Sequence, residues 1–137
     1  MNVIRSESYP VTNATEVVQI RQHVRKWAVE LGFSLIDQTK IVTAASELAR
    51  NMVDYGKGGT VTLDALDDQN RKGLRVRFDD NGPGIASIEQ ALKDGFTTGG
   101  GMGLGLGGAK RLANEFDIRS APGEGTHVVI TRWRGVA

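Results

Sequence analysis

The hydrophobic pattern in the first part of the chain predicts two helices. Apolar residues recur every three or four positions in two consecutive stretches, 12–32 and 34–55. Each stretch begins at a residue type that accepts hydrogen bonds from the first turn of a helix, namely Thr12 or Asn13 in the first stretch and Ser34 in the second. We therefore expect two consecutive helices in this part of the chain.

Segments rich in strand-forming residues precede and follow these helices. The predicted strands are 3–11, 60–66, 74–78, 116–120 and 126–133. A polar segment, 67–73, is expected to form a hairpin turn, and short helices are expected at 87–93 and 106–114. Because short turns join consecutive strands, we predict an α/β fold with mixed or antiparallel strand pairing.

The composition fits one domain without disulfides. A chain of 137 residues has the length of a single domain, so we treat 1–137 as one unit. The formal net charge of +1 argues against a protein that holds nucleic acid by bulk phosphate attraction. The chain has no cysteine, which excludes disulfides and cysteine nucleophiles. It also shows no signal peptide and no apolar run that would span a membrane, so we expect a cytoplasmic protein.

Glycine is over-represented, and its distribution suggests a phosphate site. The chain has 18 glycines, and seven of them lie between positions 99 and 108. Residues 101–106 would bring backbone amides to the start of a helix, where N–H groups and the helix dipole both favour an anion. We expect residues 95–102 to form a lid over a bound nucleotide. Thr97 and Thr98 can donate to phosphate oxygens, although a plain loop explains these two threonines equally well.

Two other phosphate-binding motifs fit this region less well. Residues 103–108 match the pattern GxGxxG of dinucleotide-binding folds. That motif needs a strand directly before it, and residues 96–100 do not form a strand pattern. A Walker-type loop is also excluded, because no Gly-Lys pair is followed by serine or threonine.

Glu47 and Asn51 are candidates for catalysis and metal binding. They are four residues apart on a predicted helix and so lie on the same face. A carboxylate there can accept a proton from an attacking hydroxyl group, and an amide oxygen one turn later can bind Mg²⁺. Taken alone, the pair fits a solvated helix face better. The other motifs of the chain reverse that preference.

Asp80 follows a predicted strand and precedes Gly82 and Gly84. A buried carboxylate can accept a hydrogen bond from the amino group of adenine, and the glycines let the backbone approach a flat base closely. An ordinary turn after a strand is the alternative, because Asn-Gly and Pro-Gly pairs are common in turns. We expect the neighbouring Asp79 to point away from the site.

Four signatures together resemble those of the GHKL ATPases and kinases. They are Glu47–Asn51, Asp80–Gly84, Gly101–Leu106 and Gly125–Thr126. That family includes DNA gyrase B, HSP90-type chaperones, MutL and the histidine kinases. The resemblance implies a Bergerat-type ATP-binding fold, in which helices cover one face of a mixed, largely antiparallel sheet in a two-layer α/β (α+β) sandwich.

The resemblance also implies the roles of single residues, with ATP and Mg²⁺ as cofactors. Glu47 would be the catalytic base, Asn51 the Mg²⁺ ligand, and Asp80 and Thr126 the residues at adenine. The full set expected to bind ATP is Asn51, Asp80, Gly82, Gly84, Thr97, Thr98, Gly101, Gly103, Leu104, Gly105, Leu106 and Thr126.

The length of the chain indicates which members of the family it resembles most. It leaves no room for the further domains of gyrase, HSP90 or MutL, or for the histidine hairpin of a histidine kinase. The segments 46–51, 95–100 and 105–112 look most like the RsbT-type switch kinases. That likeness implies a serine/threonine kinase that phosphorylates STAS-domain scaffold proteins of the stressosome and, once released, activates a PP2C-type phosphatase.

Two alternatives remain open at this point. The first is an anti-sigma factor kinase that binds a sigma factor and phosphorylates an anti-anti-sigma protein. The second is a nucleotide-gated binding module without catalysis, against which the presence of Glu47 argues.

Overall fold

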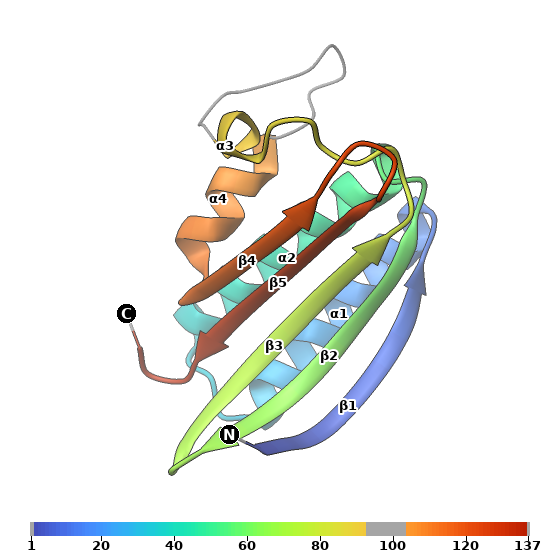
Figure 1. Ribbon diagram of the computed structural model, residues 1–137. Helices are drawn as coiled ribbons and strands as arrows, with labels where there is room; N and C mark the ends of the chain where they lie inside the picture. The colour runs from blue at the N-terminus through green and yellow to red at the C-terminus, as the bar shows by residue number, and fades with distance from the viewer. Residues whose placement is uncertain (1, 93–103, 137) are drawn as a thin grey trace.

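The computed structural model describes residues 2–92 and 104–136. Within these ranges the elements follow in the order β1 (Asn2–Val11), α1 (Ala14–Glu30), α2 (Leu35–Asp54), β2 (Gly59–Asp68), β3 (Arg71–Asp80), α3 (Ile88–Ala91), α4 (Leu104–Leu112), β4 (Glu115–Ser120) and β5 (Thr126–Trp133). The strands form one sheet, and α1, α2 and α4 lie on the same face of it (Figure 1). This arrangement confirms the predicted two-layer fold with helices on one face.

The strand order places two distant segments side by side. The order is β1-β2-β3-β5-β4, and every pair of neighbours is antiparallel. The sheet is therefore antiparallel throughout the described residues rather than mixed. Because β5 lies between β3 and β4, the last residue of β3, Asp80, is paired with the first residue of β5, Thr126.

The two long helices begin where the sequence predicts. The Asn13 side chain accepts a hydrogen bond from the backbone N–H of Glu16 at 2.9 Å, which makes Asn13 rather than Thr12 the N-cap of α1. The Ser34 hydroxyl accepts from the backbone N–H of Asp37 at 3.1 Å and caps α2. No helix in the described ranges is long and apolar enough to cross a membrane.

The turn between β2 and β3 is shorter than predicted. Gln69 and Asn70 form it alone, with φ angles of 52° and 73°. Both values lie in the left-handed region that a tight two-residue hairpin requires. The remaining polar residues of 67–73 pair across the strands, as in the ion pair of 2.9 Å between Lys72 and Asp67. Their charge made the segment resemble a loop, although they extend the hairpin.

The bounds of the last two helices differ from the predicted ones. The α3 helix comprises only four residues, Ile88–Ala91, and α4 begins and ends two residues earlier than predicted, at Leu104 and Leu112. The backbone N–H of Asn114 instead donates to the carbonyl of Thr131 at 2.9 Å, and its side chain accepts from the N–H of Trp133 at 2.7 Å. Asn114 is thus held by β5 and cannot continue the helix.

The hydrophobic core lies between the helices and one face of the sheet. Val61, Leu63 and Val76 point into this layer from β2 and β3, and each is fully buried. Ile20 of α1 and Ile41 of α2 meet them, with exposed fractions of at most 1%. Burying a side chain of this size contributes about 1.5–3 kcal/mol each, so this layer supplies most of the driving force for folding.

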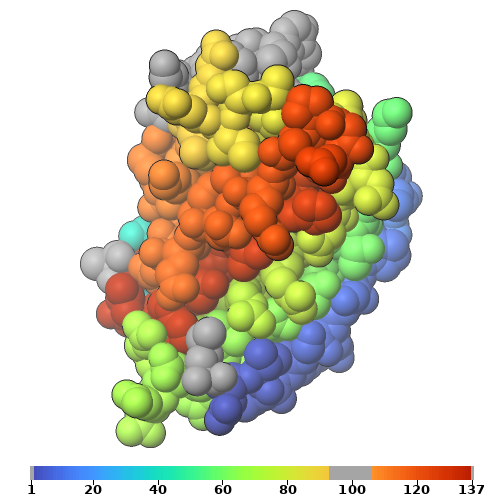
Figure 2. All heavy atoms as spheres, in the orientation of Figure 1, coloured from blue at the N-terminus to red at the C-terminus, as the bar shows by residue number. Residues whose placement is uncertain are grey.

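On the opposite face, the atoms of the strands themselves form the surface (Figure 2). One carboxylate there is buried: Asp64 of β2 is 1% exposed. It accepts hydrogen bonds from Ser6 of β1 at 2.7 Å and from Arg75 and Arg77 of β3, each at 2.9 Å. Burial opposes the ionisation of Asp64, but these hydrogen bonds and the arginine charges outweigh it and lower its pKa.

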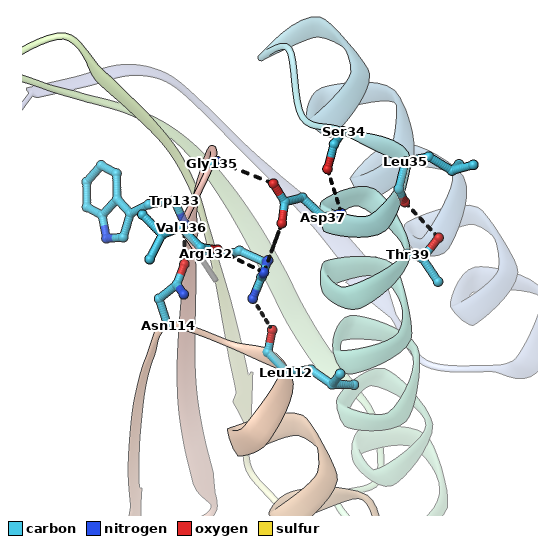
Figure 3. A network of polar contacts seen from close by, with 10 residues as sticks. All are labelled: Ser34, Leu35, Asp37, Thr39, Leu112, Asn114, Arg132, Trp133, Gly135 and Val136. Atoms are coloured by element: carbon cyan, nitrogen blue, oxygen red, sulfur yellow. Dashed lines mark hydrogen bonds and ion pairs between the residues drawn. The ribbon is translucent and has the colours of Figure 1, made fainter.

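A second polar network joins α2, α4 and the end of the chain (Figure 3). The Arg132 side chain is 2% exposed and donates to the Asp37 carboxylate at 2.8 Å. It also donates to the carbonyl of Leu112, the last residue of α4, at 2.9 Å. Asp37 in turn accepts from the backbone N–H of Gly135 at 3.3 Å. The network holds the C-terminal end of α4 against α2 and β5.

Candidate nucleotide-binding site

A cavity lies between the end of α2, the end of β3 and the starts of α4 and β5. Of the residues predicted to bind ATP, those in its lining are Asn51, Asp80, Gly84, Leu106 and Thr126. The remaining lining residues are Leu48, Met52, Tyr55, Gly56, Phe78, Ile85 and Val128. A largely apolar lining with a few polar groups suits a flat heteroaromatic ring, because the apolar walls bury its faces and the polar groups set its orientation.

Asp80 is the charged group of this cavity. It is 7% exposed, and its Oδ1 atom accepts hydrogen bonds from the backbone N–H of Gly82 at 2.9 Å and of Thr126 at 3.1 Å. Among residues 2–92 and 104–136, no group donates to Oδ2. Burial raises the pKa of Asp80, although the two backbone N–H groups act in the opposite direction. Asp80 is therefore a fixed carboxylate with one oxygen left for a ligand.

Close backbone packing surrounds this carboxylate. A Cβ atom on Gly82 would lie 2.6 Å from the Cα of Gly56, and one on Gly56 would clash with Oδ2 of Asp80. A larger residue at position 82 would therefore displace the backbone of Gly56, and a larger residue at position 56 would displace Asp80. Gly84 has a φ of 80°, and an added Cβ there would clash with the carbonyl of Ala121. The glycines of the second signature are thus required by the turn that shapes the cavity.

Thr126, the first residue of β5, is fixed by neighbours on β3 and β4. Its backbone N–H is bonded to Asp80, and its hydroxyl oxygen lies 2.9 Å from the hydroxyl oxygen of Ser120. Ser120 also contacts the loop after β3 through the backbone N–H of Ile85 at 2.8 Å. The two lining residues Asp80 and Thr126 therefore belong to one hydrogen-bonded unit.

Glu47 and Asn51 lie one turn apart near the end of α2, as predicted. Both are half-buried, and Asn51 lines the cavity whereas Glu47 lies one turn before it. Within the described residues, no group of three or more His, Cys, Asp or Glu side chains could hold a metal ion. Mg²⁺ would suit the amide oxygen of Asn51, since it prefers oxygen ligands and takes most of the others from water and phosphate.

The structure describes only part of the region that is predicted to bind the phosphates. Thr97, Thr98, Gly101 and Gly103 lie outside the described residues, as does the predicted lid 95–102. Leu104 and Gly105 form the first turn of α4, and Leu106 is 3% exposed in the cavity wall. The N-terminus of α4 therefore lies next to the cavity, where its free N–H groups favour an anion.

Asp79 points away from the cavity, as the sequence analysis expects. Its side chain lies on the opposite face of the sheet, where it contacts His127 of β5 at 2.8 Å. The Asp79 side chain is 48% exposed. Two adjacent aspartates thus have opposite environments, because successive residues of a strand face opposite sides of the sheet.

Some residues of the site escaped the sequence analysis. Gly56 follows α2 in a glycine-rich stretch and looks like an ordinary helix stop, yet it leaves the space beside Asp80. Ser120 carries no sequence signal, because its role depends on contacts with residues 85, 125 and 126. Met52 and Tyr55 lie at the end of α2 and just after it, and no sequence pattern identified either of them as part of a ligand site.

Comparison with known sequences identifies relatives along most of the chain. Residues 36–134 match the family described as histidine kinase-, DNA gyrase B-, and HSP90-like ATPases. The chain is 45% identical over 118 residues to the serine/threonine-protein kinase RsbT of Bacillus subtilis (strain 168), which covers 86% of this chain and 89% of that one. It is 31% identical over 121 residues to the anti-sigma F factor of Thermoanaerobacter sp. (strain X514), which covers 84% and 83%.

Solved structures share the fold at low sequence identity. A Mycobacterium tuberculosis protein with RsbU and RsbW domains matches 97% of this chain with a TM-score of 0.64 and 20% identity, and this chain spans 34% of that one. The SiaB–SiaC complex of Pseudomonas aeruginosa matches 96% of this chain and 90% of its counterpart, with a TM-score of 0.54 and 9% identity. These likenesses concern the fold alone.

Proposed function

Because the chain belongs to the family of histidine kinase-, DNA gyrase B-, and HSP90-like ATPases, we propose that it is an ATP-dependent protein serine/threonine kinase. The observation that carries this proposal is the open carboxylate oxygen of Asp80 in a largely apolar cavity. The similarity to RsbT supports the same activity.

The adenine ring of ATP fills the cavity in this proposal. Its exocyclic amino group donates to Oδ2 of Asp80, while Ile85 and Val128 contact the faces of the ring. The carboxylate needs no rearrangement on binding, because Oδ1 is already held by two backbone N–H groups. A preorganised acceptor of this kind adds both affinity and base selectivity.

The triphosphate then extends toward the N-terminus of α4. Backbone N–H groups of residues 101–106 bind it, with Thr97 and Thr98 as further donors. Asn51 lines the cavity and would hold Mg²⁺ through its amide oxygen. The ion would supply positive charge that stabilises the phosphates.

Glu47 acts as the general base. Its carboxylate accepts the proton of a serine or threonine hydroxyl on the target protein, and the hydroxyl oxygen attacks the γ-phosphorus of ATP. The bond between the γ-phosphorus and the bridging oxygen breaks, and ADP leaves with that oxygen. Glu47 fits this role because it lies on the same face of α2 as Asn51, one turn away.

The similarity to RsbT supports a proposal for the target and the partner. We propose that the chain phosphorylates a STAS-domain protein in a bacterial partner-switching stress response in the cytoplasm and that, when released, it activates a PP2C-type phosphatase. The second candidate is an anti-sigma factor kinase that binds a sigma factor, and the 31% identity to an anti-sigma F factor favours it. Co-purification from a lysate separates the two, because a phosphatase is expected in the first case and a sigma factor in the second.

Phosphate transfer provides the direct test. The purified chain is incubated with γ-labelled ATP, Mg²⁺ and a STAS-domain protein from the same genome. Label on the STAS protein that depends on Mg²⁺ supports the kinase. Nucleotide binding without any transfer of label would indicate the non-catalytic binding module instead.

A further inference from the structure

We propose that Ser120 determines base specificity by orienting the hydroxyl of Thr126, so that lone pairs and not a hydrogen face the cavity. This inference rests on the proposed function, because it concerns how the same cavity selects adenine. Ser120 is a positioning residue in this account, since it acts through Thr126.

The Ser120 hydroxyl makes three contacts. It lies 2.7 Å from the carbonyl oxygen of Gly125, 2.8 Å from the backbone nitrogen of Ile85 and 2.9 Å from the hydroxyl of Thr126. A carbonyl oxygen only accepts, so Ser120 must donate its single hydrogen to Gly125. A backbone N–H only donates, so Ser120 accepts from Ile85.

These two assignments determine the direction of the third hydrogen bond, which joins Ser120 and Thr126. The Ser120 hydroxyl has one hydrogen and two acceptor positions, and its hydrogen is already used. The contact with Thr126 is therefore one in which Thr126 donates and Ser120 accepts. The hydroxyl of Thr126 then has no hydrogen left for the cavity that it lines, and it presents only acceptor lone pairs there.

The cavity consequently offers acceptors from two paired residues. Thr126 supplies its hydroxyl lone pairs and Asp80 supplies Oδ2, and these residues are direct partners across β3 and β5. A primary amine, which has two N–H donors, matches such a pair, and adenine carries one at C6. A purine with a carbonyl oxygen at C6, as in guanine or hypoxanthine, would place acceptor against acceptor.

The test compares ATP with inosine triphosphate (ITP), which has a carbonyl at C6 in place of the amine and a hydrogen on N1 that adenine lacks. The dissociation constants of both are measured by calorimetry for the wild type and for Ser120→Ala. In the variant the Thr126 hydroxyl is free to turn and donate to the carbonyl of ITP. We expect the preference for ATP over ITP to fall by about tenfold, the scale of one hydrogen bond.

A purely structural role would give another result. Ser120→Ala also removes the acceptor for Ile85, which can loosen the cavity. Such loosening weakens ATP and ITP by the same factor and leaves their ratio unchanged, and an unchanged ratio would overturn the proposal. If Ser120→Ala does not fold, Ser120→Cys makes the same comparison, because a thiol is a weak hydrogen-bond group of similar size.

Two further variants complete the design. Thr126→Val removes the oriented hydroxyl, so adding Ser120→Ala to it is expected to change the ATP:ITP ratio no further; an additive effect would contradict the mechanism. Ser8→Ala is the matched control, because Ser8 and Thr62 form a hydroxyl pair of 2.8 Å on the opposite face of the sheet. It should alter neither affinity. A wild type that binds no ATP would refute the proposed function itself, and this inference with it.

Discussion

At the scale of single residues, Asp80 shows how one carboxylate can be fixed and still remain available. Its two backbone donors come from Gly82 and from Thr126, so both neighbouring segments hold the same oxygen. The other oxygen has space because residue 56 is glycine. Burial raises the pKa of the Asp80 carboxyl, because desolvation disfavours its ionised form.

Replacing Asp80 by asparagine tests its role in binding. Asp80→Asn keeps an acceptor for the two backbone N–H groups but turns an amide donor toward the amine of adenine. We expect the affinity for ATP to fall by about tenfold to a hundredfold, measured by calorimetry, because a buried hydrogen bond is lost. Asp79→Asn is the matched control, since its carboxylate lies on the other face of the sheet and contacts His127. Equal affinities in all three proteins would refute the assignment.

Glu47 is expected to affect the reaction and not the binding. Glu47→Ala should lower the rate of phosphate transfer to the STAS protein by about 10²–10⁴-fold, the usual effect of losing a general base. The dissociation constant of ATP should stay the same, because Glu47 lies outside the lining of the cavity. Transfer at the wild-type rate would place the base elsewhere on the protein.

At the scale of elements, the two ends of α4 have different surroundings. The N-terminal end of the helix lies beside the cavity, and its C-terminal carbonyl, at Leu112, is bonded to Arg132. Arg132 is in turn paired with Asp37 at the start of α2 (Figure 3). The position of the helix at the nucleotide thus depends on a buried ion pair at its far end.

Breaking this ion pair should be costly. Asp37→Ala leaves the Arg132 charge buried without its partner, and we expect the free energy of unfolding to fall by about 3–5 kcal/mol in urea denaturation. Asp67→Ala is the control, because its ion pair with Lys72 is about one-third exposed, at 36% and 34%. The control should change the free energy of unfolding by less than about 1 kcal/mol. Similar effects of the two substitutions would show that burial of the Asp37 pair is unimportant.

The same ion pairs predict how stability depends on pH. Burial opposes the ionisation of Asp37, but its contacts with Arg132 and Gly135 outweigh it and lower the pKa of Asp37 below 3.8; the pKa of Asp64 is lowered as well. A carboxyl whose pKa is lower in the folded state stabilises the fold above its unfolded pKa and loses that effect as the pH falls. We expect stability to decrease as the pH drops below about 4, with a shallower decrease in Asp37→Asn. A stability that rises on acidification would contradict this sign.

At the scale of the whole molecule, helices cover one face of the sheet, and the cavity lies where four elements meet: α2, β3, α4 and β5. The strands themselves form the surface of the other face, and most residues of β1 are exposed (Figures 1 and 2). A bound nucleotide can change the affinity for a partner protein only if it interacts differently with the partner-bound and the partner-free states of the chain.

Partner affinity should depend on the state of the nucleotide. We expect the complex with the STAS-domain protein to have different dissociation constants with Mg-ATP analogues and with Mg-ADP, because the γ-phosphate is the group that the two states do not share. A binding titration with each nucleotide measures the difference. Equal constants would leave an ATP-dependent kinase without a nucleotide-driven switch.

The sequence by itself determined the elements that depend on interactions between residues close together in the chain. The helix starts at Asn13 and Ser34 depend on hydrogen bonds to residues three positions later. Hydrophobic periods of two and of three to four residues likewise require only neighbours in the chain. The prediction of Asp80 as the site carboxylate rests on its position before Gly82 and Gly84 and on the resemblance of residues 80–84 to a family signature. With Asp80 in the cavity, the alternation along β3 places Asp79 on the opposite face.

Only the tertiary structure decided which groups complete the site and which charges are buried. The contact between Ser120 and Ile85 joins residues 35 positions apart, and that between Asp37 and Arg132 joins residues 95 apart. Such pairs depend on the strand order, which inserts β5 between β3 and β4. No local pattern encodes that order, because it follows from packing the whole sheet against the helices. The free oxygen of Asp80 and the space at Gly56 exist only after that packing is complete.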